Sequence, residues 1–173
     1  MKLLIKPRVL PLLTMVSDFL TRQDIKSYLV GGFVRDVLLE RDTADIDIAI
    51  SADALEVAPG LAAALGGRHV VLDETNRVSR IVLFDDGAPQ GKRMLDFSTI
   101  MGNIEQDLAR RDFTIDAIAV DLGELSKGHT DVQLIDPFNG WDDLHRGVIR
   151  AVADRAFESD AARLLRAVRL AAE

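Results

Sequence analysis

Cysteine is absent from this sequence of 173 residues, so neither a disulfide bridge nor a thiolate metal site can form. The fold must therefore rest on its hydrophobic core, and a hydrophobic content of 48% is enough to build one. This length predicts one domain, or one domain and the beginning of a second. A chain without disulfides fits a reducing compartment, so we expect a cytoplasmic location.

Long apolar runs are also missing. No run is long enough to cross a bilayer, and Lys6 and Pro7 interrupt the apolar start of the chain, which argues against a signal peptide. We therefore expect no membrane partner. Neither a Gly-x-Gly-x-x-Gly nor a Gly-x-x-x-x-Gly-Lys-Ser/Thr motif occurs, which disfavours a Rossmann or P-loop fold.

Positive charge is scarce over most of the chain. The net charge is −7, and phosphate affinity depends on Lys and Arg, so nucleic-acid binding by most of the chain is weakly disfavoured. Residues 145–173 differ, because they contain six arginines against four acidic residues. Acidic residues can also gather where bound metal ions neutralise them.

The spacing of apolar residues predicts a mixture of helices and strands. Helices are expected at residues 9–20, 33–39, 52–65, 104–111 and 153–173, with a break at Pro59-Gly60 left open. Strands are expected at residues 27–30, 45–50, 69–72, 80–84, 93–97, 115–120 and 132–135, two of them joined as a hairpin by the turn at 85–89. We predict an α/β fold of the α+β type, with a small mixed or antiparallel sheet and helices packed on one side.

The last expected helix is amphipathic. One face is apolar, formed by Ala161, Leu164, Leu165 and Val168. The other face carries Arg163, Arg166 and Arg169. No Gly or Pro stop signal follows, so we expect a truncated helix with further domains beyond it.

Asp45 and Asp47 are the first candidate site residues. On a strand, residues two apart point to the same face, which lets two carboxylates share divalent cations. Mg²⁺ commonly binds through one or two carboxylates plus substrate phosphates, and two such ions promote in-line phosphoryl displacement. A lone Asp-x-Asp pair is more often a solvated strand face or a turn.

Gly31-Gly32 precedes this acidic strand, between an expected strand and an expected helix. Glycines in that position let backbone N–H groups approach a phosphate, and Arg35 lies one turn into the helix. An isolated Gly-Gly pair is more often an ordinary tight turn. The order of strand, Gly-Gly turn, helix and acidic strand is more specific.

Four segments together resemble the family of class II CCA-adding enzymes and bacterial poly(A) polymerases. In family order they are Gly31-Gly32-Phe33-Val34-Arg35-Asp36 with Asp45-Ile46-Asp47-Ile48, then Arg110-Arg111-Asp112-Phe113-Thr114-Ile115-Asp116-Ala117, then Asp136-Pro137-Phe138-Asn139-Gly140 with Asp143-Leu144, and last Asp160-Ala161-Ala162-Arg163-Leu164-Leu165-Arg166-Ala167. They span almost the whole chain, and none of them alone would identify the family.

The resemblance implies a polymerase-beta-like nucleotidyltransferase head at residues 1–150 and the truncated beginning of a helical neck at 151–173. It implies two Mg²⁺ ions bound by Asp45 and Asp47. Asp96 is the candidate for a third catalytic carboxylate, although an acid on a strand face is an equally good interpretation. Arg111 and Asp112 would lie near the phosphates and sugar of a nucleotide, where Gly31, Gly32, Arg35 and Asp116 would also bind.

Asp160 and Arg163 correspond to the nucleotide-selecting pair of the family. They are three residues apart on a helix and project from the same face. Asp accepts hydrogen bonds and Arg donates them, so the pair can read a cytosine or adenine edge without a template. The alternative is a surface ion pair of little energetic weight.

The sequence departs from the family pattern in four places. Asp116 replaces the usual Asn, Ser159 replaces an acid, and Asn139 replaces Gly. Between Ile100 and Ile104 only residues 101–103 remain, where members that add the terminal A have a longer flexible loop. This short connector resembles the CC-adding branch.

The resemblance implies an RNA nucleotidyltransferase that acts on tRNA 3′ ends with CTP, ATP or both. The RNA 3′-hydroxyl would attack the α-phosphate, and pyrophosphate would leave. Three alternatives remain open: a poly(A) polymerase of the same family, a catalytically silent nucleotide- or RNA-binding domain, and a metal-binding regulatory module.

Overall fold

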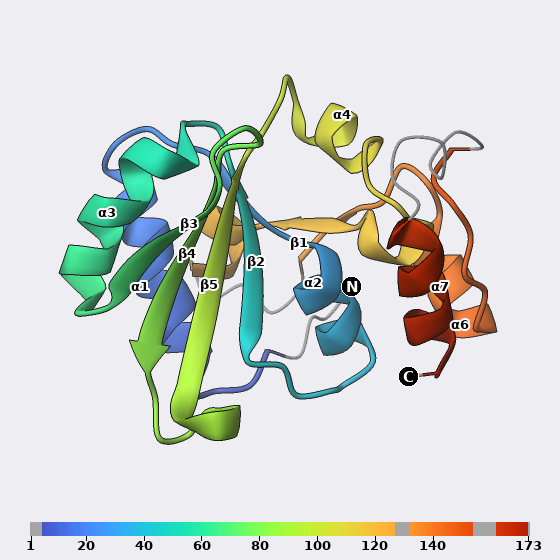
Figure 1. Ribbon diagram of the computed structural model, residues 1–173, viewed down its shortest axis with the longest axis horizontal. Coiled ribbons are helices and arrows are strands. Elements are labelled where there is room, and N and C mark those ends of the chain that lie inside the picture. Colours follow the sequence, from blue (N-terminus) through green and yellow to red (C-terminus); the bar gives the residue numbers. More distant parts are fainter. Residues whose placement is uncertain (1–4, 127–131, 154–161, 173) are drawn as a thin grey trace.

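The computed structural model describes residues 5–126, 132–153 and 162–172. Its centre is a seven-stranded sheet in the order β3-β4-β5-β2-β1-β6-β7 (Figure 1). The strands are β1 (Ser27–Val30), β2 (Asp45–Ile50), β3 (Arg68–Asp73), β4 (Val78–Phe84), β5 (Lys92–Thr99), β6 (Ala119–Asp121) and β7 (Leu134–Ile135). Among the described strands, only β2 and β5 pair in parallel, so the predicted mixed sheet is confirmed.

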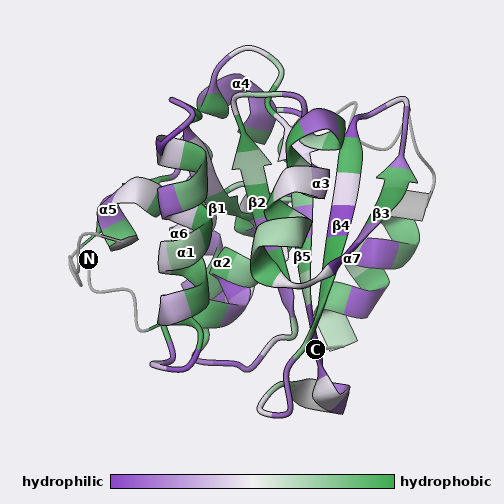
Figure 2. Ribbon diagram, turned by 90° about the vertical axis from the view of Figure 1, so that its left-hand side faces the viewer, coloured by the Kyte–Doolittle hydropathy of each residue, from purple (hydrophilic) through white to green (hydrophobic). Residues whose placement is uncertain are grey.

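The described helices are α1 (Leu10–Thr21), α2 (Gly31–Leu38), α3 (Ala54–Leu65), α4 (Ile104–Leu108), α5 (Leu122–Ser126), α6 (Gly140–Arg146) and α7 (Ala162–Ala172). Helices α1 and α3 pack on one face of the sheet and bury the main hydrophobic core with it. Figure 2 shows apolar residues along the strands and a mixture of apolar and hydrophilic residues on the covering helices. No described helix is long and apolar enough to cross a membrane.

Strand β2 divides its residues between the two faces of the sheet. Ile46, Ile48 and Ile50 are fully buried in the main core. Asp45 and Asp47 alternate with them and therefore project from the opposite face, as the period of two residues requires. Buried isoleucines on one side thus fix the side on which the two carboxylates must stand.

The segment 115–120 was expected to be one strand, and this prediction is wrong for its first half. A 3₁₀ turn, η2 (Thr114–Asp116), comes first, and β6 begins only at Ala119. The turn is closed by hydrogen bonds from the N–H of Asp116 to Phe113 and from that of Ala117 to Thr114. Apolar residues buried in a turn and in a strand give the same short pattern, which the periodicity cannot separate.

Several helices also differ from the sequence-based expectation. Helix α4 ends at Leu108, so Arg110 and Arg111 follow it. Helices α5 and α6 were not expected, because each is shorter than the window that reveals a helical period. The expected helix from residue 153 is described only from Ala162, and residues 154–161 lie outside the described part of the chain.

Helix α3 continues through Pro59, so the break left open at this residue does not occur. The Asp53 side chain caps the start by accepting a hydrogen bond from the Leu55 N–H, and Gly66 ends the helix with a φ of 67°. Ala58 and Leu61 anchor the helix in the core on both sides of the proline. Tertiary packing therefore overrides the cost of a missing hydrogen bond.

Replacing Pro59 by Ala should stabilise the fold. Pro59 is exposed, and an Ala N–H restores a helical hydrogen bond without disturbing the core. We expect the free energy of unfolding to rise by about 1 to 3 kcal/mol in urea denaturation. Ala64→Pro, at another exposed site of α3, should lower it. An unchanged or lower stability of the Pro59→Ala variant would contradict this account of α3.

Candidate functional site

The parallel pairing of β2 and β5 brings the predicted carboxylates together. Asp47 lies opposite Asp96 in the register of the two strands, and Asp45 lies two residues before Asp47. Side chains directly opposite each other point to the same face of a sheet. Three carboxylates from distant parts of the sequence therefore share one surface.

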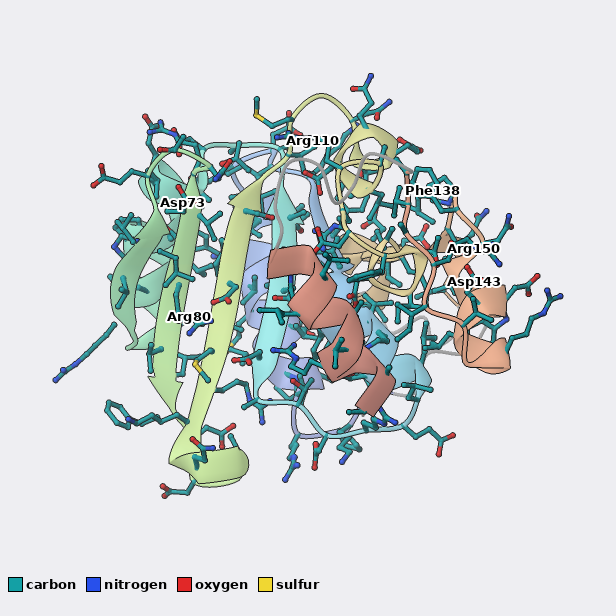
Figure 3. All side chains as sticks on the ribbon, turned by 45° about the vertical axis from the view of Figure 1, so that its right-hand side comes forward. Asp73, Arg80, Arg110, Phe138, Asp143 and Arg150 are labelled. Atoms are coloured by element: carbon teal, nitrogen blue, oxygen red, sulfur yellow. The ribbon has the colours of Figure 1, made fainter. Side chains whose placement is uncertain are left out.

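Arg80 is a partner of Asp96 that the sequence analysis did not select. Its Nε lies 2.7 Å from one carboxylate oxygen of Asp96, and its Nη2 lies 2.6 Å from the other. Figure 3 shows Arg80 on β4, beside β5. The expected hairpin could have indicated this pair, because its antiparallel register places Arg80 opposite Asp96. The charge of Asp96 is thus compensated within the protein.

Asp47 is far less well compensated. Burial, together with the smaller effect of the charges of Asp96 and Asp45, raises its pKa from 3.8 to about 6. A hydrogen bond of 3.3 Å from the Phe33 N–H and the charge of Arg111 lower the pKa but do not offset burial. A buried carboxylate beside other carboxylates has unmet demand for positive charge.

Gly31 and Gly32 open helix α2 against these carboxylates. Gly31 has a φ of 64°, and a Cβ atom there would lie 2.8 Å from Arg111 Nη1 and 3.2 Å from Asp47 Oδ2. Only glycine combines this backbone conformation with so close an approach. The Gly-Gly pair is therefore more than an ordinary turn, because it makes room for two charged side chains.

Arg35 is buried between two carboxylates. Its Nη1 lies 2.6 Å from Asp116 Oδ1, while Nε and Nη2 lie 3.0 and 2.8 Å from Asp36 Oδ1. Burial raises the pKa of Asp116, although the Arg35 charge lowers it. Asp116 thus forms an ion pair with Arg35, which an Asn there would replace by a hydrogen bond from the charged guanidinium to an uncharged amide oxygen.

Arg111 and Asp112 follow helix α4 and face the carboxylates. Arg111 Nη2 lies 3.5 Å from Asp107, and its buried Nε has no hydrogen-bond partner in the described structure. Asp112 forms an ion pair of 2.8 Å with Arg166 of α7. Arg111 is therefore only weakly paired within the protein, and Asp112 is held by an ion pair with the last helix.

A single open cavity of about 650 Å³ connects these groups. All nine predicted site residues that the structure describes with their side chains line it: Gly31, Gly32, Arg35, Asp45, Asp47, Asp96, Arg111, Asp112 and Asp116. Arg110, Arg166 and Arg169 also line the cavity. Asp160 lies outside the described residues, and Arg163 belongs to α7 but its side chain is not described.

The segment from Asp136 to Arg150 braces the turn that carries Arg111 and Asp112. Asp143 is buried, accepts a hydrogen bond of 2.8 Å from Thr114 and pairs with Arg150 at 2.9 and 3.0 Å (Figure 3). A Cβ atom at Gly140 would lie 2.0 Å from the Thr114 carbonyl oxygen, so α6 packs directly on η2. This third motif holds the site without lining the cavity.

The short connector between β5 and α4 is closed by its own hydrogen bonds. Asn103 and Gln106 form a reciprocal capping box, with 2.8 and 3.1 Å between donors and acceptors. Gly102 has a φ of 88°, and any Cβ there would collide with the Gln106 side chain. The connector is thus a compact turn that the capping box joins to the start of α4.

The carboxylates of the cavity supply part of the ligand shell of a divalent cation. The described residues contain no group of three or more His, Asp or Glu side chains arranged as a complete metal site. Asp45 and Asp47 do project into the cavity, and Asp47 has a raised pKa. This fits Mg²⁺, which completes its shell with water and substrate phosphate oxygens.

Asp47 should destabilise the metal-free fold at neutral pH. Because its pKa is raised in the fold, its stabilising contribution is full below pH 3.8 and is lost as the pH rises through about 6. In EDTA, Asp47→Asn should therefore increase the free energy of unfolding at pH 8 by about 1 to 3 kcal/mol. This advantage should shrink as the pH falls below 6, measured by urea denaturation across pH. An advantage that grows at low pH would contradict this account.

Comparison with known proteins agrees with the site geometry. The family described as the Poly A polymerase head domain matches residues 27–150. A CC-adding tRNA nucleotidyltransferase of Geobacter sulfurreducens is 38% identical over 94% of this chain and 35% of its own length. A CCA-adding enzyme of Lactobacillus helveticus is 36% identical over 96% of this chain and 40% of its own length.

Solved structures give the same result. The Thermotoga maritima CCA-adding enzyme complexed with tRNA has a TM-score of 0.78 and 37% identity over 96% of this chain and 38% of that one. A CCA-adding enzyme complexed with CTP has a TM-score of 0.80 and 37% identity over 96% of this chain and 37% of that one. The chain thus spans about two fifths of the length of these relatives. It belongs to the family of poly A polymerase head domains, which it shares with the CCA-adding and CC-adding nucleotidyltransferases.

Proposed function

We propose that the protein is an RNA nucleotidyltransferase that adds C residues to tRNA 3′ ends. The observation that carries this proposal is the shared cavity, in which Asp45 and Asp47 face Arg111 across the Gly31-Gly32 turn. Paired carboxylates and an arginine that lines the same cavity suit a metal-bound triphosphate. Relatives whose structures were determined with tRNA and with CTP support the choice of substrates.

In the proposed reaction, the 3′-hydroxyl oxygen of the RNA forms a bond to the α-phosphorus of the nucleotide. The bond between that phosphorus and the bridging α–β oxygen breaks, and pyrophosphate leaves. Asp45 and Asp47 would hold two Mg²⁺ ions, which lower the pKa of the attacking hydroxyl and neutralise the triphosphate. The proton of the attacking 3′-hydroxyl passes to solvent water in the open cavity, so the proposed step needs no general base among the described cavity residues.

The remaining site residues would each bind a different part of the nucleotide. Arg111 donates to phosphate oxygens, helped by the close backbone of Gly31 and Gly32. Asp112 accepts from the sugar, and Asp160 with Arg163 reads the base edge. Asp96, held by Arg80, shapes the field around Asp47 and is a less exposed candidate ligand than Asp45.

The short connector favours C addition alone. Residues 101–103 form a closed turn held by the capping box, so no flexible segment from this position can rearrange the base-reading pair for ATP. A CC-adding relative is as similar to the chain as the CCA-adding relatives are. The specificity therefore rests on the connector and not on overall similarity.

Extension of a labelled tRNA without its CCA end tests the proposed activity. The full-length protein is supplied with Mg²⁺ and with CTP, ATP or both. We expect two C residues and no terminal A, because the closed connector cannot change the specificity. Completion of the CCA end would retain the family activity and refute the connector argument.

A variant with Asp45→Ala and Asp47→Ala serves as the control, with Asp86→Ala as a matched change in an exposed turn outside the cavity. Only the first should abolish extension. If the unchanged protein adds no nucleotide but still binds CTP, the silent binding domain becomes the better interpretation. Long A tails made from ATP would instead identify a poly(A) polymerase.

Asp116→Asn should tighten the binding of Mg²⁺-CTP. The substitution removes one negative charge from the cavity. Of the two carboxylates that form ion pairs with Arg35 in the described structure, it leaves only Asp36. We expect the dissociation constant to fall about threefold, the effect of one screened charge several ångströms away. Isothermal titration calorimetry measures it, with Asp86→Asn as the charge-matched control. Weaker binding by the Asp116→Asn variant would show that orientation of Arg35 matters more than charge.

A further inference from the structure

Helix α7 contributes to the nucleotide cavity through residues other than the base-reading pair. Arg166 and Arg169 line the cavity together with Asp45, Asp47 and Asp112 (Figure 3, where α7 crosses in front of the sheet). On its other side, α7 exposes Leu164, Leu165 and Val168. The polar side of this amphipathic helix thus faces the head, and its apolar side faces away.

The charge of the cavity depends on this placement. Six aspartates line it: Asp36, Asp45, Asp47, Asp96, Asp112 and Asp116. Five arginines among the described residues line it too: Arg35, Arg110, Arg111, Arg166 and Arg169. Two of these five come from α7, so without the helix the cavity would have twice as many aspartates as arginines, a poor environment for a triphosphate.

Arg166 makes a more specific contact as well. Its Nη2 lies 2.8 Å from Oδ2 of Asp112, whose side chain is only 14% exposed. The backbone of Asp112 is fixed from the other direction, because its carbonyl oxygen accepts a hydrogen bond of 3.1 Å from the Val152 N–H. Asp112 is thereby held at both its main chain and its carboxylate.

We propose that Arg166 is a positioning residue that orients the Asp112 carboxylate toward the sugar hydroxyls of the incoming nucleotide, so that selection of ribose depends on α7. This inference rests on the proposed function. Asp112 is an acceptor, and a sugar hydroxyl is a donor that a deoxynucleotide lacks. A buried acceptor left without its donor penalises the deoxynucleotide, and a carboxylate free to rotate would lose much of that discrimination.

Direct nucleotide binding by the full-length protein tests the proposal. Dissociation constants are measured by calorimetry with Mg²⁺ for CTP and for its 2′-deoxy and 3′-deoxy analogues. The unchanged protein should prefer CTP to at least one analogue. Arg166→Ala should reduce that preference about tenfold, chiefly by weakening CTP, as expected when a hydrogen bond to a charged group is lost.

Two further variants separate positioning from charge and from folding. Asp112→Asn should lose the same preference, and combining it with Arg166→Ala should cause little additional loss, because both act through one contact. Arg166→Lys retains the charge and a donor and should recover part of the preference. Arg68→Ala, which removes an arginine of the exposed edge strand β3, should leave the preference for CTP unchanged.

The outcomes are distinct. If Arg166→Ala weakens CTP and both analogues equally, Arg166 contributes only charge and the positioning role is refuted. The positioning role is also refuted if Arg166→Ala keeps the full preference for CTP. If the unchanged protein binds no nucleotide at all, the proposed function itself fails. An unaltered thermal unfolding midpoint in Arg166→Ala would confirm that any loss arises in the site.

Discussion

The crowding of carboxylates on one face of the sheet is the constraint on which the rest of the site depends. The parallel register of β2 and β5 sets Asp47 beside Asp96, and the buried isoleucines of β2 prevent Asp45 and Asp47 from turning inward. Like charges this close are unfavourable in a partly buried place. The surrounding structure therefore supplies cations from several directions.

These cations come from four separate elements. Arg80 on β4 forms an ion pair with Asp96, and Arg35 on α2 forms ion pairs with Asp36 and Asp116. Arg111, in the segment after α4, lies with Asp47 beside Gly31. Helix α7 adds Arg166 and Arg169. Of the six aspartates that line the cavity, only Asp45 and Asp47 have no ion pair within 4 Å among the described residues, and a divalent cation would be bound most favourably there.

Much of this arrangement could be predicted from the sequence. The alternation in residues 45–50 gives both the strand and the face of its carboxylates, and the motifs locate Arg111 and Asp112. The pair of Arg80 with Asp96 could also have been predicted, because it follows from the register of the β4–β5 hairpin. The ion pairs of Arg35 with Asp116 and of Asp112 with Arg166 were not, since they join residues 81 and 54 positions apart whose proximity depends on tertiary packing. Short elements such as η2 and α6 could not be predicted, because they contain too few residues to show a helical period of apolar positions.

The position of α7 has a consequence for motion. Because Arg166 and Arg169 belong to the cavity, filling the cavity and seating α7 on the head are thermodynamically linked, and each must favour the other by the same free energy. A triphosphate bound in the cavity would therefore hold α7 more firmly against the sheet, and its departure would weaken that contact by the same free energy.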